Sequence, residues 1–282
     1  DLSIDINNLQ QVANNVTVTA GGPSVDLGLF DGGNAGEGEI GGQVAVNSGA
    51  LNFTSNVTST VSNSSAIDVD GSATLSYGSN NVNLFGGSDT DTGLDVNGDA
   101  SISGSGTVTL ADESGDTPTL DLNGNGVENL TLDAETTLGS NAEVSSLLDQ
   151  NDDITGGSDL TLSGDAVIND PDGGRTFNAG TFIVAGSEVE GETNVNFDDL
   201  EVNTSGTATF ATNDTDNPRV FEVESSFTHT EGDLSIGVND IELQDASFSS
   251  GNDAGSISAN GGFLVVDDRG GNNFVGFDTG NN

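Results

Sequence analysis

The sequence reads Leu160-Thr-Leu162-Ser-Gly164-Asp165 and returns, about twenty residues later, as Phe182-Ile-Val184-Ala-Gly186. In both stretches apolar residues alternate with others, as in a β-strand that buries one face, and a glycine-containing turn follows. One such strand cannot bury its apolar face alone, but stacked copies can. The pattern therefore predicts a repeated strand-and-turn unit. Further copies read Leu200-Glu-Val202-Asn and Leu234-Ser-Ile236-Gly237.

Reading from turn to turn divides residues 44–282 into coils of roughly 20 to 27 residues. Within these coils the period of two assigns alternate side chains to the inside. The step from Phe197 to Leu200 breaks the alternation, so Asp198-Asp199 is interpreted as a corner. We expect an all-β fold, a right-handed parallel β-helix (β-solenoid), in which some of the 13 Phe residues stack between coils. The side chains predicted to point inward include Val195, Phe197, Leu200, Val202, Ala208 and Phe210.

One coil, Thr119–Ile154, is longer than the others. It contains Ser140-Asn-Ala-Glu143, which has the form of a helix capping box, and Val144, Leu147 and Leu148 follow at helical spacing. We therefore expect one or two helical turns at a corner of this coil.

The first 43 residues fit the repeat less well. Leu2, Ile4 and Ile6 alternate like a strand, and a stretch rich in Gly and Glu follows. We interpret residues 1–43 as an N-terminal strand segment with an irregular cap, and residues 44–282 as the β-solenoid.

A resemblance rests on two phrases, Thr176-Phe-Asn-Ala-Gly-Thr-Phe-Ile-Val-Ala-Gly186 and Asn196-Phe-Asp-Asp-Leu-Glu-Val-Asn-Thr-Ser-Gly206. Together they resemble the β-solenoid repeats of large secreted surface proteins of Bacteroidota-type bacteria, with related coils in haemagglutinin-like autotransporter adhesins. The resemblance covers roughly residues 93–282 and concerns the style of the repeat. It implies a right-handed β-helix and a cell-surface or matrix role, and it transfers no catalytic residue. The acidity of the chain departs from most members.

Charge is the most extreme property of the chain. Forty-six acidic residues face three arginines, so the formal net charge is −43. Such a chain repels phosphate backbones and anionic lipids, and no apolar run is long enough to span a bilayer. We therefore expect no nucleic-acid partner and no membrane insertion. Two compatible interpretations of the acidity stay open: a surface suited to high-salt or marine surroundings, and carboxylates that bind Ca²⁺.

Several Asp and Asn residues are candidate ligands for calcium. The stretch Asp121-Leu-Asn123-Gly-Asn125-Gly126 matches the first half of an EF-hand loop, but its twelfth position is Leu132 rather than Glu. The alternative interpretation of this stretch is a polar turn between strands. Aspartates at equivalent turns of neighbouring coils can also converge on one hard cation. For a structural Ca²⁺, and no other cofactor, the candidates are Asp68, Asp70, Asp89, Asp91, Asp95, Asp121, Asn123 and Asn125.

The reactive groups of the chain argue against an enzyme. There is no cysteine, which excludes disulfides and thiolate chemistry. Gly36-Glu-Gly-Glu-Ile-Gly41 matches a dinucleotide-binding pattern, but no helical pattern follows it. The single histidine, His229, lies in an alternating strand and is expected to face outward. Paired aspartates are common in so acidic a chain, so we expect no catalytic residues.

The ends of the solenoid suggest its function. Each end of such a stack exposes unpaired backbone groups and apolar core, and neither end here has an amphipathic capping helix. Because residue 1 is Asp, we expect that a secretion signal has been removed. We expect an extracellular or cell-surface structural protein whose partner is itself and which assembles head-to-tail into a filament; the alternative is a monomeric adhesin that binds carbohydrate or another surface ligand. The candidate assembly residues are Leu2, Ile4, Ile6, Phe263, Val265, Phe274 and Phe277.

Overall fold

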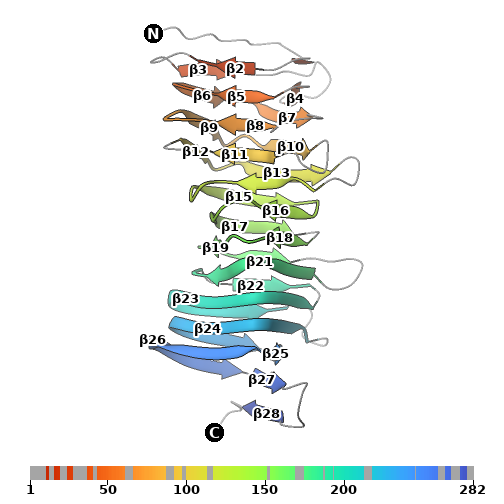
Figure 1. Cartoon of the computed structure of the whole chain (residues 1–282), viewed down its shortest axis with the longest axis vertical. Coiled ribbons are helices and arrows are strands. Elements are labelled where there is room, and N and C mark those ends of the chain that lie inside the picture. Colours follow the sequence, from red (N-terminus) through yellow and green to blue (C-terminus); the bar gives the residue numbers. More distant parts are fainter. Residues whose placement is uncertain are drawn as a thin grey trace. The chain divides into compact units, whose positions relative to one another are not determined.

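Stacked β-strands, joined by turns and bends, make up the described part of the chain. The chain forms two compact units, Asp1–Glu143 (unit 1) and Val144–Asn282 (unit 2). Nearly all strands pair in parallel as the coils of a β-solenoid (Figure 1), so the predicted all-β parallel stack is confirmed. No helix capable of crossing a membrane occurs among the described residues. The computed structural model describes residues 11–12, 16–19, 24–27, 37–40, 43–60, 66–86, 92–96, 100–112, 117–150, 153–168, 175–186, 188–192, 194–212, 218–244, 246–259, 264–267 and 274–277.

Unit 1 has three columns of parallel strands, in which each strand pairs with its counterpart one coil later. Column A contains β2 (Val16–Val18), β5 (Val44–Val46), β8 (Ile67–Val69), β11 (Thr92–Val96), β14 (Thr119–Asp121) and β16 (Thr136–Leu138). Column B contains β3 (Ser24–Leu27), β6 (Ala50–Phe53), β9 (Thr74–Gly78) and β12 (Ser101–Gly104). Column C contains β1 (Gln11–Val12), β4 (Glu37–Ile40), β7 (Asn56–Thr60), β10 (Val82–Gly86), β13 (Thr107–Asp112) and β15 (Gly126–Leu132).

Unit 2 has longer strands that turn corners, so one strand can serve several columns. The longest of these strands are β17 (Ala142–Gln150), β21 (Arg175–Val184), β23 (Val195–Ala211), β24 (Val220–Gly237) and β26 (Ser247–Ala259). Column D contains β18 (Ile154–Gly156), the first parts of β21, β23 and β24, then β25 (Asp240–Gln244) and β27 (Leu264–Asp267). Column E contains β19 (Leu160–Leu162) and the first part of β26. It also contains the parts of β21, β23 and β24 that come directly after their column D residues. Column F contains β20 (Ala166–Ile168), β22 (Glu188–Gly191) and the last parts of β23, β24 and β26.

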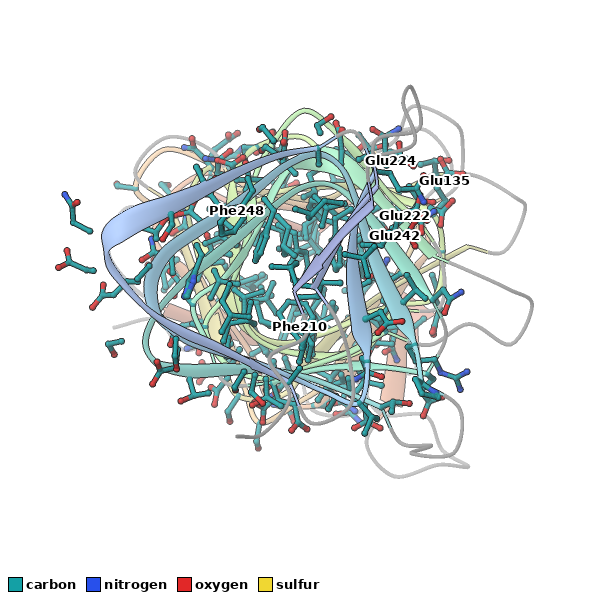
Figure 2. All side chains as sticks on the ribbon, turned by 90° about the horizontal axis from the view of Figure 1, so that it is seen from below. Glu135, Phe210, Glu222, Glu224, Glu242 and Phe248 are labelled. Atoms are coloured by element: carbon teal, nitrogen blue, oxygen red, sulfur yellow. The ribbon has the colours of Figure 1, made fainter. Side chains whose placement is uncertain are left out.

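The core of each unit consists of the alternate, inward side chains of these strands. In column A, Val44, Ile67, Leu94 and Leu120 follow one another in register, and all four are buried. All six inward residues predicted in β23 are buried as well, which confirms the period of two. Figure 2 looks along the columns and shows Phe210 inside the ribbon, with Glu222 and Glu242 outside it.

Stacked phenylalanines fill part of the core of unit 2. The ring of Phe182 lies 5.1 Å from Phe177, edge to face, and 5.1 Å from Phe197, tilted by 46°. Such arrangements suit the quadrupoles of aromatic rings. The expected stacking of Phe residues between coils is therefore confirmed.

The predicted helix at residues 140–148 is wrong. This segment is strand β17, and Val144 and Leu147 are both buried on its inward side although they are three residues apart. Ser145-Ser146 between them forms a corner, as Asp198-Asp199 does in β23, so the spacing that suggests a helix is that of a corner. Inside the long predicted coil Thr119–Ile154, Thr119 already pairs with Thr137, so a short coil closes within it.

Strands of the N-terminal segment continue the stack. The described strands β1 and β3 pair in parallel with β4 and β6, as later coils do. Leu2, Ile4 and Ile6 lie outside the described residues. The division of the chain at residue 43 stays a prediction.

Candidate functional site

Three aspartates lie in register on the outward face of column A. Asp68 of β8 pairs with Asp95 of β11, and Asp95 pairs with Asp121 of β14. Neighbouring strands lie about 4.8 Å apart, so these carboxylates follow one another closely. We call these three residues the aspartate ladder. It is bounded by Ala45, which pairs with Asp68, and by Gly139, whose Cα faces Asp121.

Burial and like charge both act on Asp68. Burial raises the pKa of its carboxyl, and the charges of Asp70 and Asp95 raise it further. Its Oδ1 atom is buried and accepts no hydrogen bond. Like charges directly opposite each other in a sheet are destabilising. The aspartate ladder is therefore a locally unfavourable feature of an otherwise regular stack.

Carboxylates in unit 2 are arranged differently, because hydroxyls of the next coil face them. The Thr230 hydroxyl donates to Glu201 Oε1 at 2.7 Å. Asp233 Oδ1 accepts from the Ser256 backbone N–H at 2.7 Å and from the Ser256 hydroxyl at 2.9 Å, and these bonds lower the pKa of Asp233. In each of these pairs an acid faces a hydroxyl of the next coil, whereas acid follows acid in the aspartate ladder.

The loop at Asp121–Gly126 is a polar corner, in agreement with the alternative interpretation of its sequence. The Asn123 N–H donates to the Ser140 hydroxyl of the next coil at 2.6 Å and more weakly to Asp121 Oδ1 at 3.3 Å. The Asn125 side chain donates to the Leu122 carbonyl at 2.9 Å. These hydrogen bonds hold the corner together and join it to the next coil. They do not direct the side chains toward one common point.

The remaining predicted calcium ligands divide into two groups. Asp70 is close enough to influence Asp68 electrostatically, whereas Asp89 and Asp91 lie outside the described residues. Within the described ranges, no group of three or more His, Cys, Asp or Glu side chains is arranged to hold a metal ion. The structure thus brings Asp68, Asp95 and Asp121 into one column and keeps Asn123 and Asn125 in a separate corner.

Asp68→Asn is expected to stabilise the protein at neutral pH in the presence of chelator, by about 0.2–1 kcal/mol, because it removes one like charge from the ladder. The folded state holds the Asp68 proton more tightly than the unfolded chain, since its pKa is raised. The carboxyl therefore favours the fold at pH below its ordinary pKa, and this contribution is lost as pH rises through the raised value. Thermal melting at several pH values should show that the gain in stability from Asp68→Asn shrinks at acid pH.

Glu143→Gln is the matched control, because Glu143 is exposed and the substitution removes the same charge. A gain as large for Glu143→Gln would show that overall charge, not the ladder, is responsible. The same melting curves, recorded at matched ionic strength with calcium and with chelator, test the expected structural Ca²⁺. Identical melting curves with calcium and with chelator would count against a structural Ca²⁺.

The second notable feature is the outer edge of β26. Phe182, Leu200, Phe227 and Phe248 follow one another in column E, each in register with the next. The first three are completely buried, but Phe248 is 46% exposed. Its ring packs on Phe227, with centroids 5.5 Å apart, and its other face has no described strand over it. Column E therefore ends with its last core residue uncovered.

Column D ends in another way. After β27, the chain reverses, and β28 (Phe274–Phe277) pairs with β27 in antiparallel register, with Leu264 opposite Phe277. The predicted assembly residues Phe274 and Phe277 thus lie in a strand that covers the edge of β27. Val265, in β27, is half-buried, and Phe263 lies outside the described residues. The open edge belongs to β26, which the sequence prediction did not single out.

His229 is buried, 1% exposed, so the prediction that it faces outward is wrong. Its Nε2–H donates to the Gly232 carbonyl at 2.7 Å. Gly232 has φ +82°, and a Cβ there would lie 2.1 Å from the Thr204 carbonyl oxygen. The imidazole thus stabilises the corner at Gly232, where the backbone conformation and the close contact allow only glycine. His229 lies two residues after the inward Phe227, so the alternation of the strand already predicts that it faces inward.

Comparisons of the chain with protein-family models, curated proteins and solved structures found no match. The resemblance to secreted β-solenoid repeats concerns the style of the repeat and identifies no family. The features of the molecule that bear on its function are therefore the edge of β26 and the distribution of charge.

Proposed function

We propose that this chain is an extracellular structural protein whose copies assemble head-to-tail into a filament at a cell surface or in a matrix. The observation that carries the proposal is the uncovered end of column E. Phe227 is fully buried because Phe248 lies over it, whereas Phe248 itself remains 46% exposed. One further strand would complete its burial. A contact of this head-to-tail kind does not close on itself, so it propagates into a filament.

The edge of β26 supports the same proposal through its backbone. This strand is 13 residues long, and β24 is the one described strand with which it pairs. Long unpaired edges are templates for strand addition, and natural proteins usually cover or charge them. The outward residues of the first part of β26 are serines rather than charged groups. The first part of this edge therefore lacks the charged residues that usually protect an edge against another strand.

The net charge of −43 sets the conditions for assembly. Acidic surfaces repel each other sideways, which disfavours lateral aggregation, and the same repulsion opposes an axial contact in dilute salt. At about 1 M salt, charges are screened beyond roughly 3 Å. We therefore expect assembly to strengthen with salt, in keeping with the proposed high-salt or marine surroundings.

Phe248→Glu is expected to keep the protein monomeric at salt concentrations where the original chain assembles, because it places a charge in the uncovered apolar position. Leu148→Glu is the matched control, since Leu148 on β17 is 45% exposed and the charge change is identical. Sedimentation velocity should show large species for the original chain and for Leu148→Glu only. Assembly of Phe248→Glu at the original level would contradict the proposed contact, and circular dichroism checks that each variant is folded.

A further inference from the structure

We infer that β26 accepts a single strand donated by residues 1–8 of a second copy, rather than a whole coil stacked flat upon it. This inference rests on the proposed head-to-tail assembly and names the two surfaces that would meet. The donor is residues 1–8 of the second copy, and the acceptor is the outer edge of residues 247–250.

The end of unit 2 is stepped, which decides between the two modes of contact. β25 and β26 both pair with β24, so they belong to the same coil. Column D continues beyond β25 with β27 and then β28, whereas columns E and F have no described strand beyond β26. A flat coil needs all columns to end level, and column D would block it. A lone strand can instead add to the edge of β26 beside β27 and β28, which extend column D by two strands at about 4.8 Å each.

Residues 1–8 have the pattern that this edge requires. Leu2, Ile4 and Ile6 alternate with polar residues, so a strand made of them has one apolar face for the core and one polar face for solvent. They lie outside the described residues and precede the first described strand, β1, which begins at Gln11. Addition of such a strand to an open edge supplies main-chain hydrogen bonds, and the alternate side chains provide specificity.

The pairing of acids with hydroxyls in unit 2 selects the register. Ser226 donates to Asp199, the residue opposite it one coil earlier, and in the same manner Ser256 donates to Asp233. In an added strand the roles are exchanged, because its acid would accept from a serine of β26. Ser249 suits this role, since its hydroxyl can accept from the Thr228 hydroxyl at 3.1 Å and donate onward, whereas the Ser247 hydroxyl donates to the Ser225 carbonyl. Among residues 1–8, Asp5 is the acid flanked by apolar residues on both sides. Parallel pairing of Asp5 with Ser249 then places Ile4 on Phe248.

Cysteine cross-linking tests this contact, because the chain has no cysteine of its own. Two full-length variants, Asp5→Cys and Ser249→Cys, are mixed under assembling conditions and oxidised. Residues opposite each other on paired strands are close enough for a disulfide. We expect a disulfide-linked dimer, identified by mass spectrometry of the joined peptides. Ile4→Cys mixed with Ser249→Cys should link far less, since position 4 points to the other face of the strand.

Further measurements separate the failure of this inference from the failure of the proposed function. Deletion of residues 1–8 should abolish filaments, and Phe248→Glu introduced into the Ser249→Cys variant should reduce the cross-link at least tenfold. Filaments that form without the link between positions 5 and 249, or that survive the deletion, would overturn the donated strand while leaving head-to-tail assembly in place. A stronger link of Ser249→Cys to a Ser3→Cys variant than to Asp5→Cys would overturn the register. An intact chain that stays monomeric at all concentrations would overturn both proposals.

Discussion

Gly186→Ala is expected to destabilise unit 2 by about 3 kcal/mol or more, because the added methyl group has no space. A Cβ at this position would lie 2.1 Å from the carbonyl oxygen of Gly164, the glycine that occupies the corresponding turn one coil earlier. Gly164 in turn lies against the carbonyl oxygen of Ser145, which a Cβ would approach to 2.0 Å. Backbone is on both sides of each contact, so relief requires the coils to separate. Urea unfolding at fixed salt concentration measures the loss.

Gly157→Ala is the matched control for this substitution. A Cβ at Gly157 would meet no atom within 4 Å, and the backbone there is not in the left-handed region. Its stability should change little or rise slightly, since alanine restricts the unfolded chain. An equal loss for the two variants would show that glycine is not needed for close stacking at residue 186.

Phe182→Ala is expected to cost about 3–5 kcal/mol, as large-to-small substitutions in a packed core do. Phe182 is fully buried and contacts Phe177 of its own strand and Phe197 of the next coil. Removing its ring leaves a cavity that two adjacent coils line and that a rigid stack cannot easily collapse. Phe248→Ala, at the exposed end of the same column, should cost much less. Urea unfolding of both variants tests this difference, and comparable losses would contradict the assignment of Phe248 to an uncovered end.

The sequence was sufficient to predict the all-β stack and most of the inward residues, because both follow from local alternation. Phe197 and Leu200 are both buried around the Asp198-Asp199 corner, as the broken alternation indicates. The same reasoning failed at Val144 and Leu147. A corner and a helical turn give identical spacing, and only the coils packed above and below distinguish them.

The candidate sites depend on register between coils, which local patterns do not contain. Asp68, Asp95 and Asp121 align because their coils have nearly equal lengths, whereas Asn123 and Asn125 fall in a corner. The uncovered position of Phe248 likewise depends on which strands lie over β26. No local feature of its sequence separates it from a core phenylalanine.

Electron microscopy of the intact chain, over a series of protein and salt concentrations, tests head-to-tail assembly most directly. Our account predicts unbranched filaments one subunit wide that lengthen as salt is raised, and that disappear when Phe248 is replaced by Glu. Isolated particles at every protein and salt concentration would contradict it.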